Sequence, residues 1–246
     1  MQRNTKRSQP TKTNINELKK KLIVANKILE SEKLATPFGH VSIRIPGTET
    51  FLITRSVAPG AATLNDILVC DLNGTILQGK YKDTYSEVVI HSGAYKIRKD
   101  FNSVVHSHPP YVIALSSAGL TVLPSNLQAT SLGPEPIAVF GKMVFIDRLE
   151  WGEEIAALFG PNSAVILKGH GAVAAGTSVE EAIYATRILE TSAMTQWRAR
   201  CVGTLVMPTE EEKQILTAYH QGVKRPGHGG AREWAYYESK LKKRPL

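Results

Sequence analysis

The chain has 246 residues, of which 42% are hydrophobic and 21% charged, as in one globular domain, and no apolar run is long enough to span a bilayer. Its net charge of +8 gathers near the two ends instead of forming a basic stripe interleaved with aromatic residues, which argues against nucleic-acid binding. The two cysteines, Cys70 and Cys201, give neither a disulfide framework nor a cysteine metal cluster, so a reducing cytoplasm is expected.

The first half of the chain alternates helical and strand-like patterns. Residues 1–13 are basic and polar with no apolar segment after them, which predicts a flexible tail and not a secretory signal. Apolar residues at helical spacing predict a helix over 14–33, capped by Asn14. Short strands are expected at 40–45, 50–54 and 66–72, followed by a turn at Asn73-Gly74. A helix from Ser86 to Arg98 and a strand at 103–108 follow.

The second half continues this mixture without strict alternation of strand and helix. Helices are expected at residues 111–119, 151–160 and 178–200. Strands are expected at 137–140 and 143–146, and two more across the Gly-rich centre of residues 164–176. The pattern predicts a single α/β domain over residues 14–205, with a central, mostly antiparallel sheet between helices, and a less periodic extension at 206–246.

The segment "VVHSHPP" (104–110) carries two histidines that can share one face of a strand. Side chains two apart in a strand point the same way, so His106 and His108 lie roughly 6 to 7 Å apart, a workable span for two imidazoles on one metal ion. Taken alone, the pair is more simply explained as one core histidine and one surface donor.

Further polar residues favour the metal explanation. His170 stands between two glycines, where backbone can approach a ligand closely, and His40 follows Gly39 before a strand. Glu87 lies in the first turn of a helix, which stabilises a carboxylate, and His91 comes one turn later. Three histidines and one glutamate suit a first-row divalent metal.

The ordered motifs "GHVSIR", "YSE", "VVHSHPP" and "LKGHGAVAAG" resemble the class II aldolase/adducin family over about residues 16–200. The resemblance implies that His106, His108 and His170 bind one divalent ion per subunit (Zn, Mn, Fe or Co). It implies that Glu87 is the catalytic glutamate and a further metal ligand when substrate is absent. It also implies a largely antiparallel sheet flanked by helices, and a homo-oligomer, usually a tetramer, with its site at a subunit interface.

The sequence departs from the sugar-phosphate members of this family at the phosphate cradle. His40 stands where those members have Asn, residues 54–60 ("TRSVAPG") replace a Ser-Gly pair, and Tyr85 replaces the first of two serines. A cradle needs small hydroxyls and free N–H groups, whereas the planar fork of Arg55 suits a carboxylate. This pattern resembles a subgroup that decarboxylates hydroxylated aromatic, pyridine or semialdehyde carboxylic acids.

The predicted function is therefore a metal-dependent lyase that breaks a carbon–carbon bond, most simply a decarboxylase of a small hydroxylated carboxylate. His40 is expected to assist the departing carboxylate or supply a proton, and Arg55 to bind a carboxylate. Glu87 would act as base or hold a substrate hydroxyl. The remaining candidates are Tyr85 in the catalytic group, His91 in support of the metal ligands, and three substrate-binding residues besides Arg55: Gly39, Ser56 and Ser86.

Three alternatives stay open. A sugar-phosphate aldolase or epimerase of the fuculose-phosphate aldolase type is the nearest, and an iron-dependent oxygenase of the same fold is another. The third is a metal-free structural protein of the adducin branch, but the presence of all three histidines argues against it.

The extension at 206–246 lies beyond the family's core motifs. Trp234, Tyr236 and Tyr237 are bulky anchors, and His228 sits in a Gly-rich loop. They predict a terminal helix that packs on its own or a neighbouring subunit, with a lid over an aromatic substrate as the alternative. His220 is expected at the surface.

Overall fold

The computed structural model describes residues 14–222 and 230–243, so the predicted tail at 1–13 and His228 lie outside the described residues. The described chain contains an eight-stranded sheet in the order β4-β3-β2-β1-β5-β8-β7-β6. Its strands are β1 His40–Arg44, β2 Thr50–Thr54, β3 Ile67–Asp71, β4 Ile76–Gln78, β5 Ser103–Ser107, β6 Val139–Phe140, β7 Ala164–Leu167 and β8 Gly171–Gly176. All neighbours are antiparallel except the parallel pair β6–β7.

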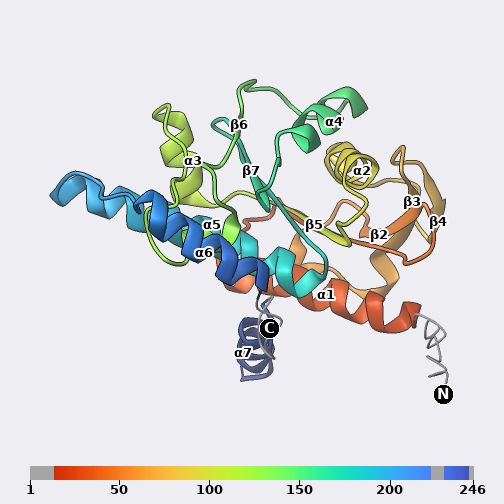
Figure 1. The fold of residues 1–246 in the computed structure, drawn as a ribbon. Helices are drawn as coiled ribbons and strands as arrows, with labels where there is room; N and C mark the ends of the chain where they lie inside the picture. The colour runs from red at the N-terminus through yellow and green to blue at the C-terminus, as the bar shows by residue number, and fades with distance from the viewer. Residues whose placement is uncertain (1–13, 223–229, 244–246) are drawn as a thin grey trace, which may run out of the picture.

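Helices cover both faces of this sheet, which confirms the predicted fold class (Figure 1). Those with α-helical geometry are α1 Ile15–Ser31, α2 Val88–Ile97, α3 Pro110–Ser117, α4 Leu149–Ala157, α5 Val179–Val202, α6 Glu210–Gly222 and α7 Ala231–Lys243. Three short 3-10 turns join them: η1 Pro59–Ala61, η2 Leu64–Asp66 and η3 Ala129–Leu132. The helices α2 and α4 pack on one face, and α1, α3, α5 and α7 on the other.

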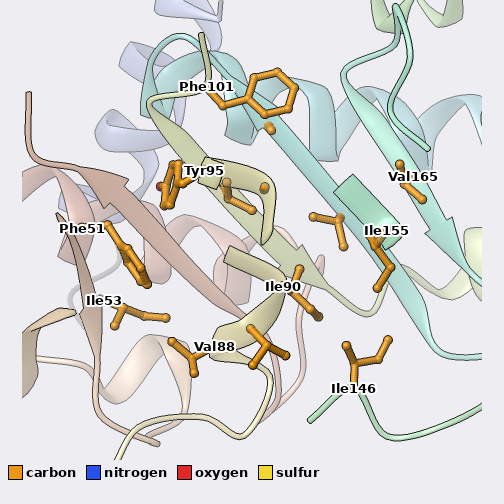
Figure 2. Packing of buried hydrophobic residues seen from close by; sticks show 14 of the residues in the cluster. Phe51, Ile53, Val88, Ile90, Tyr95, Phe101, Ile146, Ile155 and Val165 are labelled. Carbon is orange, nitrogen blue, oxygen red and sulfur yellow. The ribbon is translucent and has the colours of Figure 1, made fainter. Parts of the chain in front are cut away.

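The two-residue period of the strands decides which side chains enter which layer. In β1, Val41 and Ile43 pack with α1, so His40, Ser42 and Arg44 point the opposite way, toward α2. Figure 2 shows the apolar cluster on the α2 side, where Phe51, Tyr95 and Ile90 lie among the buried residues. The polar side chains of β1 therefore lie at the edge of this buried apolar cluster.

Two predictions about secondary structure need correction. Residues 143–146 were expected as a strand, but they form no ladder: Met143, Val144 and Phe145 are exposed and only Ile146 is buried. An apolar run cannot by itself show whether a neighbouring strand is available to pair with it. The extension at 206–246 was expected to form a terminal helix, but its described residues contain both α6 and α7. The strand β4, which was not predicted, follows the predicted turn at Asn73-Gly74.

The C-terminal helix packs against its own chain. Trp234 and Tyr237 are buried in the cluster formed with α1 and the start of α5, and Lys240 pairs with Glu32. This position is on the face of the sheet opposite α2. His220, expected at the surface, is half-buried and lies 3.0 Å from the hydroxyl of Thr130. No helix among the described residues is long and apolar enough to cross a membrane.

Candidate metal centre

The polar centre is assembled at one end of the three middle strands. In the ladder between β1 and β5, His40 is directly opposite His106, and His106 is in turn opposite Val173 of β8. Pro109 and Pro110 follow His108 and turn the chain into α3. His170 lies in the tight turn between β7 and β8.

Glu87 reaches this centre from the N-terminus of α2. It occupies the capping position of that helix, but its side chain makes no capping hydrogen bond and turns toward the histidines. Its Oε1 lies 3.2 Å from Nε2 of His170, and its Oε2 lies 3.4 Å from Nε2 of His106. The Nε2 atoms of His106 and His108 are 2.9 Å apart. One ligand atom from each of these four residues falls within 4.8 Å of the others.

The hydrogen bonding of His106 indicates what this centre needs. Its Nδ1 lies 3.1 Å from the carbonyl oxygen of Ala172, which only accepts, so Nδ1 carries the proton. The lone pair of Nε2 therefore faces His108 and the Glu87 carboxylate. Oε1 of Glu87 is buried without a hydrogen-bond partner among the described residues. Such converging lone pairs fit a divalent cation, and the backbone carbonyl behind His106 is the kind of support that metal-binding histidines have.

The protonation states of these residues also suit the binding of a divalent cation. Burial alone would raise the pKa of the Glu87 carboxyl, but hydrogen bonds and positive charge from His106 and His40, when these imidazoles are protonated, outweigh burial and hold it well below its usual range. Burial and the nearby histidines lower the pKa of His108 to about 3, and burial also lowers that of His170. At neutral pH the carboxylate is thus ionised while these imidazoles are neutral, as metal ligands must be.

His40 lies beside the four residues, and Nε2 of its ring points toward Glu87. Its Nε2 is 3.7 Å from Oε2 of Glu87 and is buried without a hydrogen-bond partner among the described residues. Burial lowers its pKa to about 4. The ring of Tyr85 packs on the His40 ring with the centroids 4.1 Å apart. Behind it, Nε2 of the fully buried His91 lies 2.7 Å from Nδ1 of His40, so His91 supports His40 and not a metal ligand directly.

The residues predicted to bind substrate lie around this edge but do not all converge. Tyr85 donates its hydroxyl to the carbonyl of Val57 and contacts the hydroxyl of Thr54, so it joins His40 to the loop after β2. In that loop the Arg55 Nε is paired with Asp66 at 2.6 Å, and the guanidinium lies over the Tyr81 ring.

The smaller predicted residues have different surroundings. Ser56 and Ser86 are exposed and have no hydrogen bond in the described structure that ties them to the centre. Gly39 is buried with φ of +117°, and its backbone passes beside the carbonyl oxygen of His106.

Two residues of the centre were not predicted from the sequence. The hydroxyl of Ser42 lies 2.6 Å from Nδ1 of His91 and 2.7 Å from the hydroxyl of Tyr95, all fully buried. The spacing held a signal for both: Ser42 shares the strand face of His40, and Tyr95 follows His91 by one helical turn.

Comparison with known proteins agrees with this arrangement. Residues 20–197 match the model of the class II aldolase and adducin N-terminal domain, so the chain belongs to this family. It is 32% identical over 168 residues to a 3,4-dihydroxyphthalate decarboxylase of Arthrobacter keyseri, which covers 63% of this chain and 67% of that protein. It is also 32% identical over 157 residues to an L-fuculose phosphate aldolase of Methanococcus maripaludis, covering 62% of this chain and 80% of the relative.

Solved structures show the same fold. An aldolase II superfamily protein from Pseudomonas syringae superposes with a TM-score of 0.80 at 27% identity and covers 95% of both chains. Family membership supports an enzyme of the lyase class that works with a divalent metal on a small molecule, and the Glu87, His106, His108 and His170 group supplies a set of residues that could hold one.

Proposed function

We propose that the protein is a divalent-metal-dependent decarboxylase of a small hydroxylated carboxylic acid, aromatic or semialdehyde. The observation that carries this proposal is the set of side chains beside the metal centre: His40, Tyr85 and Arg55. Where a phosphate would need small hydroxyls and free N–H groups, the packed and tilted rings of His40 and Tyr85 fill the space. Arg55 lies in the loop that the Tyr85 hydroxyl contacts and is oriented by Asp66. The similarity to a 3,4-dihydroxyphthalate decarboxylase supports the same substrate class.

The proposed metal ligands are His106, His108 and His170, joined by Glu87 when substrate is absent, with Zn, Mn, Fe or Co as the ion. A bound divalent ion supplies Lewis acidity that stabilises negative charge on a substrate oxygen. The chain's own residues do the rest. Arg55 binds a substrate carboxylate with the part of its guanidinium that Asp66 leaves free. Glu87 holds a substrate hydroxyl or accepts its proton, and it returns that proton to the carbon from which CO2 leaves. His40 and Tyr85 exclude water and orient the leaving carboxylate, with Gly39, Ser56 and Ser86 around the entrance.

Metal analysis of the purified protein is the first test. We expect near-stoichiometric divalent metal, and we expect His106→Ala and His170→Ala to lose it. His220→Ala, which removes a half-buried histidine that contacts Thr130 instead, is the matched control and keeps its metal. Equal metal content in all three variants would reject the proposed ligand set.

Carbon dioxide release then tests the reaction. Hydroxylated aromatic and semialdehyde carboxylates are screened with the metal that the first test identifies, and Arg55→Ala is compared with Arg55→Lys. We expect the lysine variant to recover little, because a point charge does not replace a bidentate fork. Release of an aldehyde from a sugar phosphate, with no CO2 from any acid, would reject the decarboxylase in favour of an aldolase. Oxygen consumption would indicate an oxygenase.

We further propose that the enzyme is a cytoplasmic homo-oligomer, a tetramer as is common in the family. Several large apolar side chains are exposed in this single chain near the end of α5 and beyond it, including Trp197, Val202 and Val206. Such exposed apolar surface is typical of contact sites between subunits. Cys70 and Cys201 are both free, in keeping with a reducing compartment. Light scattering on the eluted protein measures the mass, and a monomer would contradict the proposal.

A further inference from the structure

A chain of hydrogen bonds runs from the core to the edge of the metal centre. It begins at the hydroxyl of Tyr95 in α2, which lies 2.7 Å from the Ser42 hydroxyl. From there it passes to Nδ1 of His91 at 2.6 Å, and Nε2 of His91 lies 2.7 Å from Nδ1 of His40. It ends at Nε2 of His40, which has no hydrogen-bond partner among the described residues and points at Glu87.

Counting hydrogens along this chain gives it one direction. Ser42 and Tyr95 each carry one hydroxyl hydrogen, and both side chains are buried away from water. Besides the two hydroxyl oxygens, Nδ1 of His91 is the only acceptor that the described structure places against them. Both hydrogens are used only if Tyr95 donates to Ser42 and Ser42 donates to His91. Any other arrangement leaves a buried hydroxyl hydrogen without an acceptor, which costs its desolvation.

The direction propagates through both imidazoles. With Nδ1 of His91 accepting, the proton of His91 is on Nε2, from which it is donated to Nδ1 of His40. The proton of His40 is therefore on its own Nε2. The surroundings of His40 support the same assignment independently. Its Nε2 lies 3.7 Å from the ionised Glu87 carboxylate, where an N–H group is favoured over a lone pair.

We infer that Ser42 and His91 are positioning residues that hold His40 as the Nε2–H tautomer, so that His40 presents a hydrogen-bond donor, and not a base, to the metal centre. The inference about its use rests on the proposed function. A fixed N–H beside Glu87 would bind an anionic oxygen of the substrate, such as that of the leaving carboxylate. It could not remove a proton from the substrate, so that task is left to Glu87.

The tautomers can be measured directly. Histidine labelled with ¹⁵N at Nδ1 is incorporated into the full chain, which is loaded with Zn²⁺, a diamagnetic ion, and studied by magic-angle-spinning NMR. Protonated and unprotonated ring nitrogens give well-separated signals, and His40→Asn and His91→Asn assign the two residues. We expect unprotonated Nδ1 in both, while His106, whose Nδ1 faces the Ala172 carbonyl, gives the protonated signal as an internal reference. A protonated Nδ1 in His40 or His91 would overturn the inference.

Two variants, each of which deletes one buried hydroxyl, distinguish the direction of the hydrogen bonds from a general effect of disturbed packing. Ser42→Ala removes the donor to His91, so we expect its Nδ1 signal to divide between the two forms. Tyr95→Phe leaves the Ser42 hydrogen, which still needs Nδ1 of His91, so the tautomers should not change. Ser42→Thr keeps the hydroxyl and should restore the wild-type spectrum. Equal disturbance by Tyr95→Phe and Ser42→Ala would contradict the assigned direction.

Kinetics give the second measurement. For an acid that the protein decarboxylates, we expect Ser42→Ala to lower kcat in proportion to the loss of the Nε2–H form, about twofold for an even division, with little change in KM, because a donor aimed at developing charge acts mainly in the transition state. An unchanged kcat would show that the His40 N–H is not used. Failure to find any decarboxylated acid, with the tautomers as expected, would reject the proposed function and leave the tautomer assignment standing.

Discussion

The carboxylate of Glu190 in α5 lies 3.1 Å from the backbone nitrogen of Tyr111, in the first turn of α3, and 3.2 Å from that of Val112. A residue distant in sequence thus satisfies the free N–H groups at the start of this helix. The helix begins two residues after His108, and near its end Ser116 accepts a hydrogen bond from the backbone of Gly169. Through α3, Glu190 therefore helps to fix the segments that carry His108 and His170.

Removal of this carboxylate should weaken both the fold and the metal centre. We expect Glu190→Ala to lower the free energy of unfolding by about 1–2 kcal/mol, the typical effect of losing a helix cap, and to weaken Zn²⁺ binding. Glu190→Gln keeps one acceptor oxygen and should lose less. Urea denaturation and metal titration measure the two effects. Equal stability of the alanine variant and the wild type would show that α3 does not need this contact.

The same residue makes stability depend on pH. Burial raises the pKa of Glu190 above its usual 4.5, although the N–H groups of Tyr111 and Val112 oppose the shift. A carboxyl with a raised pKa in the folded state stabilises the fold below its unfolded pKa and loses that contribution as pH rises through the folded value. The free energy of unfolding of the wild type, relative to Glu190→Gln, should therefore fall as pH increases above about 4.5. A difference that rises with pH over this range would show that the N–H groups of Tyr111 and Val112 outweigh burial and that the pKa of Glu190 is not raised.

Gly39 is needed where the chain enters β1. Its φ of +117° suits glycine, and an added Cβ would lie 2.9 Å from Cβ of Ala35 and 3.2 Å from the carbonyl oxygen of His106. We expect Gly39→Ala to destabilise the protein by about 2–3 kcal/mol. The control is Gly47→Ala, where φ is +76° but nothing lies within 4 Å, so only the backbone cost of about 1 kcal/mol applies. Thermal unfolding compares them, and equal losses would show that the close approach is not rigid.

Much of the fold could be predicted because the patterns that reveal it are local. The spacing of apolar residues in α1, α2 and α5 and the two-residue period of β1 and β5 were visible in the sequence. The segment 143–146 is also apolar, yet it joins no strand of the sheet in the described structure. Whether a run pairs depends on the neighbours that the tertiary fold provides, which a local pattern does not contain.

In the candidate site, too, the sequence revealed the residues of local motifs but not the contacts that depend on the tertiary fold. The sequence placed His106, His108, His170 and Glu87 in one hypothesis, and the structure brings them together. It could not show that Asp66 pairs with Arg55, or that His91 stands behind His40 and not behind a metal ligand. Those relations depend on how α2 packs across β1 and on the loop after β2, contacts between segments whose distance in space the sequence does not give.

The packing of α2 against α4 offers a test of how firmly Glu87 is held. Gly93 of α2 faces Gly152 of α4 so closely that a Cβ on Gly93 would overlap the Gly152 carbonyl group. Because Glu87 immediately precedes α2, pushing the helices apart should move its carboxylate away from His106 and His170.

We expect Gly93→Ala to cost about 1–3 kcal/mol of stability, as overpacking does, and to weaken Zn²⁺ binding. Gly141→Ala, where nothing lies within 4 Å, is the matched control and should change neither. Denaturation of the metal-free protein isolates the packing cost, and titration with Zn²⁺ then measures the centre. If Gly93→Ala lost stability but bound Zn²⁺ as the wild type does, Glu87 would not depend on the position of α2 for metal binding.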